Sequence, residues 1–207
     1  MSSNFYLIRP YPNDDLRIEE FRQKNVIAIG WGDIGNVLGK SRDEIRELLK
    51  HSLREHPERL RNALSTFLIF LGLKEGDYIL APESGMGPIH VARVVGGYRY
   101  DPSCRAGDWA HQCGVQWGAT YKRDDVADSK LSSALKFPGT AANLRSHKTA
   151  IRIMLGLHDA SAEPADTFVT AEYPLRPGAL CKVSFPRDMT QDEARRLSIF
   201  VGTLYFG

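Results

Sequence analysis

Residues 26–37 have the sequence VIAIGWGDIGNV, and this stretch decides the fold. Its first five residues are apolar or small, and such a continuous run predicts a buried β-strand. The strand leads directly into Gly-Trp-Gly-Asp. Glycine permits a tight turn and a close approach of the backbone, and a tryptophan that only fills a core needs neither. We therefore predict that Trp31 binds a ligand and that its flanking glycines make room for a ring.

The same stretch has the G-x-G-x-x-G spacing of a dinucleotide-binding turn, but its context argues against that function. The bulky Trp31 stands between the first two glycines. The acidic residue that holds the ribose would fall within residues 51–55, inside a predicted helix rather than at the end of a second strand. Hairpins follow instead of repeated βαβ units, so a dinucleotide site is disfavoured.

Further elements are predicted on both sides of this stretch. Before it, residues 4–10 form a short strand, and residues 16–24 form one or two amphipathic turns. After it come two helices, 41–53 with Ser41 and Glu44 at capping-box spacing, and 57–72 with Pro57 at its first position. Strands 74–82 and 88–102 form a hairpin around the glycine-rich loop 83–87.

The rest of the chain continues this α+β pattern. Another strand is predicted around residues 115–117 and a short helix or turn over 142–154. Residues 161–166 have the composition of a linker. A strand over 179–186 and a helix over 189–206 follow, the helix with a second capping box at Thr190 and Glu193 and with an apolar face of Ala194, Leu197, Val201 and Leu204. We expect two parts, a domain at 1–157 and a strand-helix extension at 158–207.

Composition places the chain among ordinary globular proteins. Hydrophobic residues make up 43% and charged residues 25%, while the net charge is only +2. That charge is too small to indicate a polyanionic partner by itself. Three cysteines leave one unpaired in any disulfide scheme, which suits a reducing compartment. Neither a signal peptide nor a membrane-length apolar run is evident, so we expect a cytoplasmic protein that does not bind membranes.

Catalytic signatures are weak. The GKS at residues 39–41 lacks the upstream glycine of a phosphate-binding loop. Cys104, His111 and Cys113 lack the paired spacing of a zinc knuckle. The sequence therefore predicts neither enzyme activity nor a metal site or cofactor. A metal-dependent nuclease or nucleotide hydrolase, with Asp33 and Asp108 holding the metal, stays open as an alternative.

Aromatic residues gather at predicted strand ends and loops instead. Aromatic faces at such positions can stack on a planar ring such as a nucleobase. Core packing is an equal alternative for Trp117, and Trp109 could serve as a lid or a surface residue. The aromatic set comprises Trp31, Tyr98, Tyr100, Trp109, His111 and Trp117.

The order of these segments over residues 5–157 resembles the N-terminal domain of some restriction endonucleases of the Mrr type. That domain is related to EVE and YTH domains in the PUA-like superfamily. The segments that carry the resemblance are 25–37, the helical pair, 73–82, 88–102 and 111–117. The resemblance implies a small barrel or a curved mixed sheet with packed helices. It also implies a pocket for a flipped or unpaired modified base.

We accordingly predict a non-catalytic module that recognises a modified base in DNA, in defence against foreign DNA. An RNA-binding module of the same superfamily is the alternative. No nuclease core is evident, so an effector nuclease would come from another protein, and the extension could form a homodimer contact. The expected base-binding residues are Trp31, Gly32, Asp33, Ser84, Trp109, His111 and Trp117. The expected phosphate contacts are Arg93, Arg99, Lys122, Arg123, Arg145 and Lys148.

Overall fold

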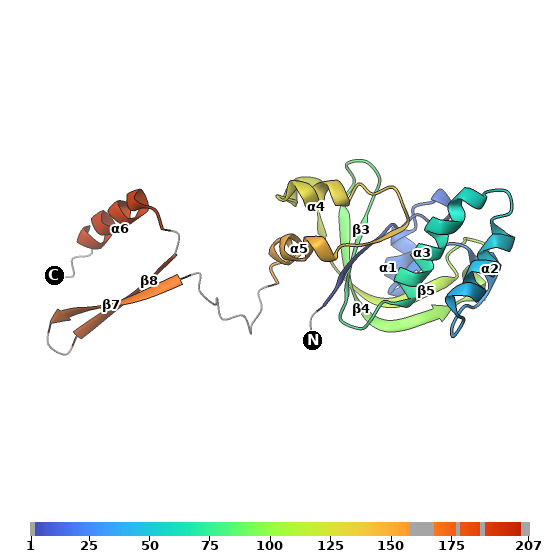
Figure 1. Ribbon diagram of the computed structural model, residues 1–207, viewed down its shortest axis with the longest axis horizontal. Coiled ribbons are helices and arrows are strands. Elements are labelled where there is room, and N and C mark those ends of the chain that lie inside the picture. Colours follow the sequence, from blue (N-terminus) through green and yellow to red (C-terminus); the bar gives the residue numbers. More distant parts are fainter. Residues whose placement is uncertain (1–2, 158–167, 177–178, 187–188, 204–207) are drawn as a thin grey trace. The chain divides into compact units, whose positions relative to one another are not determined.

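The computed structural model describes residues 3–157, 168–176, 179–186 and 189–203 (Figure 1). The chain divides into two compact units, residues 1–157 and residues 158–207. Each unit is described by itself below. No described helix combines the length and the apolar character that crossing a membrane requires.

The first unit is built on a six-stranded mixed sheet with the strand order β2-β5-β4-β3-β1-β6. β1 and β3 pair in parallel, and the other neighbours pair antiparallel. No pairing joins β2 to β6 in the described residues, so the sheet is open rather than a closed barrel. The predicted α+β class is confirmed. The strands are β1 Phe5–Ile8, β2 Val26–Ile29, β3 Tyr78–Pro82, β4 Ile89–Tyr100, β5 His111–Tyr121 and β6 Ala141–Asn143.

Helices pack on both faces of this sheet, with α1–α3 gathered around β4 and β5 and with α4 and α5 beside β3 (Figure 1). The α-helices are α1 Ile18–Lys24, α2 Arg42–Ser52, α3 Leu60–Leu71, α4 Ser129–Ala134 and α5 Lys148–Met154. Short 3-10 turns are η1 Pro12–Asp14, η2 Gly32–Ile34, η3 Pro57–Arg59, η4 Pro102–Cys104, η5 Arg123–Asp125 and η6 Arg145–His147.

Two hydrophobic cores result from the alternation of side chains along the strands. Ile79 and Ala81 of β3 face the larger core, which they share with α1–α3. Leu80 faces the smaller core with Leu131 of α4 and Ile151 of α5. The middle of the sheet is therefore covered on both sides, and α2 is anchored to it from one side.

Several predicted elements are confirmed. Ser41 and Glu44 form the capping box of α2, since the Glu44 carboxylate accepts from the Ser41 N–H at 2.7 Å and the Glu44 N–H donates to Ser41 Oγ at 3.3 Å. The hydrogen bonds that the Glu44 carboxylate accepts from the Ser41 N–H and hydroxyl hold the pKa of Glu44 below its usual value. The β3–β4 hairpin is formed, with Pro82 paired to Ile89.

Other predictions need correction. Pro57 opens the turn η3, and α3 itself begins at Leu60. The short helix or turn predicted over 142–154 is confirmed for η6 and α5, but its first two residues belong to the short edge strand β6. β5 extends well beyond the three residues expected. The helix α4, which Asp128 caps, has no counterpart among the predictions.

The second unit contains a β-hairpin and one helix, so it is more than the expected strand and helix. β7 Phe168–Arg176 pairs antiparallel with β8 Ala179–Pro186, and α6 spans Gln191–Thr203. The predicted strand at β8 and the capping box of Thr190 and Glu193 are confirmed. On the predicted apolar face of α6, Ala194 and Leu197 are partly buried, and Val201 is 52% exposed. The predicted linker 161–166 and Leu204 lie outside the described residues.

Arg123 is a structural residue rather than a phosphate contact. It is only 8% exposed. Its guanidinium donates to the carbonyl oxygens of Glu83 at 2.8 Å, Gly87 at 3.1 Å and Leu135 at 3.5 Å. One buried cation thus ties the β3–β4 loop to the end of α4.

Replacing Arg123 with alanine should destabilise the first unit, because the carbonyl groups would lose their donor in a buried position. We expect a loss of about 3 kcal/mol in the free energy of unfolding. Urea unfolding of the full chain followed by tryptophan fluorescence measures this loss, since all three tryptophans lie in the first unit. The exposed Arg145→Ala is the control and should change stability by less than about 0.5 kcal/mol. Equal losses in the two variants would contradict a structural role.

Candidate functional site

The loop that follows β2 has an unusual backbone at Trp31. This residue has φ 66° and ψ 37°, in the left-handed region. A non-glycine residue in this region costs about 1 kcal/mol or more, so the surroundings must hold it there. The Trp31 ring is half-buried and packs against Phe67 of α3, with 5.7 Å between the ring centroids.

The two glycines beside Trp31 serve the packing of the loop. A Cβ at Gly30 would lie 2.5 Å from Oδ2 of Asp108, and a Cβ at Gly32 would lie 3.3 Å from Cβ of Ala110. Both glycines therefore let the turn lie directly against residues 105–110. This corrects the expectation that they make room for a ligand ring.

Asp108 also secures the turn by a hydrogen bond. Its carboxylate accepts a hydrogen bond from the Gly32 N–H at 2.8 Å. Burial raises the pKa of Asp108, and hydrogen bonds from the backbone of Gly32 and Trp31 oppose that rise. Asp108 is thus occupied by backbone donors. In the described part of the chain, no group of three or more His, Cys, Asp or Glu side chains is placed to hold a metal ion.

A chain of hydrogen bonds from the sheet closes the loop between Trp31 and Val37. The Val37 N–H donates to the Tyr98 hydroxyl at 3.2 Å, and that hydroxyl lies 2.8 Å from Nδ1 of His111. His111 Nε2 lies 3.0 Å from the carbonyl oxygen of Trp31. Because a carbonyl only accepts, Nε2 carries the proton and Nδ1 accepts from Tyr98. We call this arrangement the His111–Tyr98 clasp.

The clasp requires a neutral imidazole. His111 is fully buried, and this burial lowers its pKa from 6.5 to about 4, although the Trp31 carbonyl and the charge of Asp33 act in the opposite direction. Burial also raises the pKa of Tyr98, which keeps its hydroxyl protonated as a donor. Tyr100 adds one more anchor by donating to the Gly32 carbonyl at 2.8 Å.

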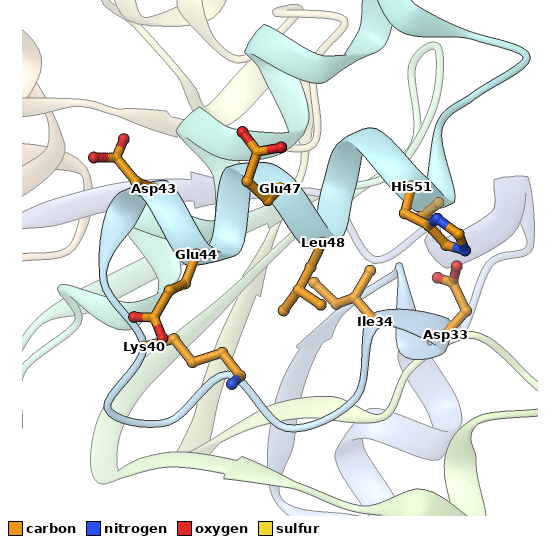
Figure 2. Close-up of a pocket in the computed structure, with 9 residues that line it drawn as sticks. Asp33, Ile34, Lys40, Asp43, Glu44, Glu47, Leu48 and His51 are labelled. Atoms are coloured by element: carbon orange, nitrogen blue, oxygen red, sulfur yellow. The ribbon is translucent and has the colours of Figure 1, made fainter.

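The held loop forms one wall of a pocket whose other wall is α2 (Figure 2). The pocket has a volume of about 610 Å³. Ile34 and Leu48 lie in its middle, Asp33 and His51 at one end, and Lys40 with Glu44 at the other (Figure 2). The lining residues are Asp33, Ile34, Lys40, Asp43, Glu44, Glu47, Leu48, His51 and Ser52. Trp31 is not among them.

The sequence-predicted base-binding residues do not converge on this pocket, apart from Asp33. Trp109 is 8% exposed, and its ring packs on Phe21 with the Lys24 ammonium 4.8 Å from its centroid. Trp117 is half-buried and donates to the Phe21 carbonyl at 3.1 Å. Both tryptophans therefore pack around α1, and Trp109 is a core residue rather than a lid.

Ser84 lies far from Trp31 along the sheet. Its loop joins β3 to β4 next to Ile89, which pairs with Tyr121 at the end of β5. His111, beside Trp31, begins β5. Ten residues of strand correspond to roughly 30 Å, so Ser84 and Trp31 do not share one site.

The predicted phosphate contacts are scattered. Arg93 and Arg99 are exposed on β4, where Arg99 donates to Gln112, while Lys122, Arg145 and Lys148 belong to the segments around η5, η6 and α5. Sequence reasoning missed Arg105, which is an exposed cation. Arg105 lies beside Gly32, since a Cβ added at Gly32 would be 3.4 Å from the Arg105 Cγ.

Sequence reasoning also missed most of the pocket lining. Residues 40–52 have the pattern of an ordinary amphipathic helix with its polar face in solvent, so no local signal marks them as a site. The pocket depends on the clasp, Asp108 and Tyr100, which together hold the loop opposite α2.

Comparison with known families identifies a family to which most of the first unit belongs. The model of a family described as "Domain of unknown function (DUF8426)" matches residues 10–139. This range includes β2, the His111–Tyr98 clasp and the whole pocket. No curated protein matches the chain.

Replacing Gly30 with alanine should destabilise the unit through Asp108. The added methyl group would displace the Asp108 carboxylate from the Gly32 N–H, at a cost of about 1–3 kcal/mol. In an Asp108→Ala background the same substitution should cost at least about 1 kcal/mol less. Urea unfolding of both single variants and the double variant measures this coupling. The control is Gly97→Ala, because a Cβ at Gly97 meets nothing within 4 Å. Its effect on the free energy of unfolding should add to that of Asp108→Ala. If the effects of Gly30→Ala and Asp108→Ala were also additive, the contact between Gly30 and Asp108 would be contradicted.

Acidification should loosen the clasp. The unfolded chain binds a proton at His111 more readily than the folded chain between pH 6.5 and about 4. The free energy of unfolding should therefore fall as the pH drops through this window, by up to about 3 kcal/mol from this residue. A His111→Gln variant should lose this part of the pH dependence, while His51→Gln, at an exposed histidine, should keep it. An NMR titration in which the His111 imidazole protonates near pH 6.5 would refute the prediction.

Proposed function

This chain belongs to the DUF8426 family, a domain of unknown function, and from its site we propose that the first unit is a non-catalytic module that binds a modified base of DNA. The base would enter the pocket between α2 and the loop 31–40. The observation that carries the proposal is the pocket itself, which adjoins a backbone strained at Trp31 and held by buried polar groups.

The pocket has the construction expected of a base site. Its volume of about 610 Å³ lies within the range of roughly 300–1,000 Å³ that small-molecule sites occupy. Ile34 and Leu48 offer apolar surface to the faces of a ring, and carboxylates at the rim offer acceptors for its edge. Asp33 has no hydrogen bond or ion pair with any other described residue, so its oxygens are available to a ligand.

A relation to the PUA-like superfamily, and to its EVE domains, is part of the proposal. The support is the mixed sheet with packed helices, together with the sequence order of strand β2, the Trp31 loop, two helices and the β3–β4 hairpin. In this relation the loop after β2 holds the base, and the aromatic residues at its foot hold the loop.

The polymer would have to approach with its phosphates away from the rim, since the rim is acidic. We propose that Arg105, beside Gly32, contacts a phosphate. Each such contact releases counterions, so the affinity should fall as salt increases. DNA and RNA of matched sequence differ in the 2′-hydroxyl, so comparing their affinities identifies which polymer the first unit binds.

Filling the pocket should abolish binding. We expect Leu48→Trp to lower the affinity for single-stranded DNA with one modified base at least about tenfold, because the indole would occupy the space of the base. Fluorescence polarisation of labelled oligonucleotides with and without methylated bases measures binding, and circular dichroism checks that the variant is folded.

The control for this experiment is Asp124→Asn, at an exposed carboxylate that does not line the pocket. It should bind like the original protein. The proposal fails if the original protein binds none of the modified strands at low salt, or if Leu48→Trp binds them as well as the original does. If the matched RNA binds more tightly than the DNA, the partner of the first unit is RNA instead of DNA.

A further inference from the structure

The charge of the pocket narrows the choice of base. Its lining carries four carboxylates, one ammonium group and one histidine, which gives a net charge of −3 with His51 neutral. On the premise that the pocket binds a base, we propose that it selects a base that is positively charged at neutral pH. Adenine methylated at N1 and cytosine methylated at N3 have this property.

The carboxylates differ in the hydrogen bonds and ion pairs that they already form. Glu44 Oε2 accepts from both the N–H and the hydroxyl of Ser41, each at 2.7 Å. Glu47 forms an ion pair with Lys50 at 2.6 Å. Asp33 and Asp43 form no hydrogen bond or ion pair within the described residues. These two groups supply the uncompensated charge.

A charged ring gains more in this pocket than a neutral one. A neutral base can only donate hydrogen bonds to the carboxylates, whereas a cationic base also gains their Coulomb attraction, which is stronger beside low-polarity groups than in water. Ile34 and Leu48 provide such groups in the middle of the pocket (Figure 2). The same charge repels phosphate groups, so the pocket disfavours nucleotides that would enter phosphate-first.

Methylation on the pairing edge also lowers the cost of extrusion. Taking a base out of a duplex costs a few kcal/mol, and the cost is least for a damaged base that does not pair. A methyl group at N1 of adenine or N3 of cytosine blocks the edge that forms base pairs. One modification therefore provides both the charge that the carboxylates attract and a base that is already unpaired.

Isomeric bases test the proposal, because they differ in charge but not in composition. Single-stranded DNA with one 1-methyladenine is compared with the same strand carrying N6-methyladenine, and 3-methylcytosine is compared with 5-methylcytosine. We expect the full chain to bind the cationic isomer at least about tenfold more tightly. The advantage should shrink when NaCl rises from about 50 mM to about 300 mM, since salt screens exposed charges.

A double variant links the preference to the pocket. Asp33→Asn with Asp43→Asn should reduce binding of the cationic isomer about tenfold more than binding of the neutral isomer, which loses only hydrogen bonds to the carboxylates, whereas Asp124→Asn should change neither. If both isomers bind equally well and Leu48→Trp abolishes their binding, the proposed selection for charge is overturned, whereas the proposal that the pocket binds a base stands. Absence of binding to all four strands would overturn both proposals.

Discussion

The His111–Tyr98 clasp is the constraint on which the rest of the site depends. It joins the two ends of the loop that follows β2, through the Trp31 carbonyl at one end and the Val37 N–H at the other. Both clasp residues belong to long central strands of the sheet, so the loop takes its position from the most extensively paired part of the unit. A strained tryptophan backbone persists because this network, together with Asp108, fixes the polar groups on either side of it.

The pocket follows from this constraint by simple geometry. α2 is set by the burial of Ile45 and Leu49 in the larger core, and its capping box fixes where the helix begins. The clasp sets the opposite wall independently. Among the lining side chains, Glu44 caps α2 and Ile34 and Leu48 pack against the larger core, whereas Asp33 and Asp43 have no hydrogen bond or ion pair with another described side chain.

The sequence predicted those features whose causes are local. The apolar run of β2, the capping boxes at Ser41 and Thr190, and the β3–β4 hairpin all depend on residues close together in the chain, and all are confirmed. The reason for the glycines beside Trp31 was mistaken, because it lies with Asp108 and Ala110, far along the sequence. Arg123 was misjudged for the same reason, since only the folded chain shows the three carbonyl groups around it.

The lining of the pocket is confined to one continuous segment, residues 33–52, whereas the residues that hold its loop lie at 98–111. Substitutions at the exposed polar residues of the lining, such as Asp43, Glu47 and His51, can therefore change its charge without touching the clasp or the cores. Members of one family could share this scaffold and differ in the ligand that they accept. The segment is also short enough to be exchanged as a unit between relatives, which makes specificity separable from folding.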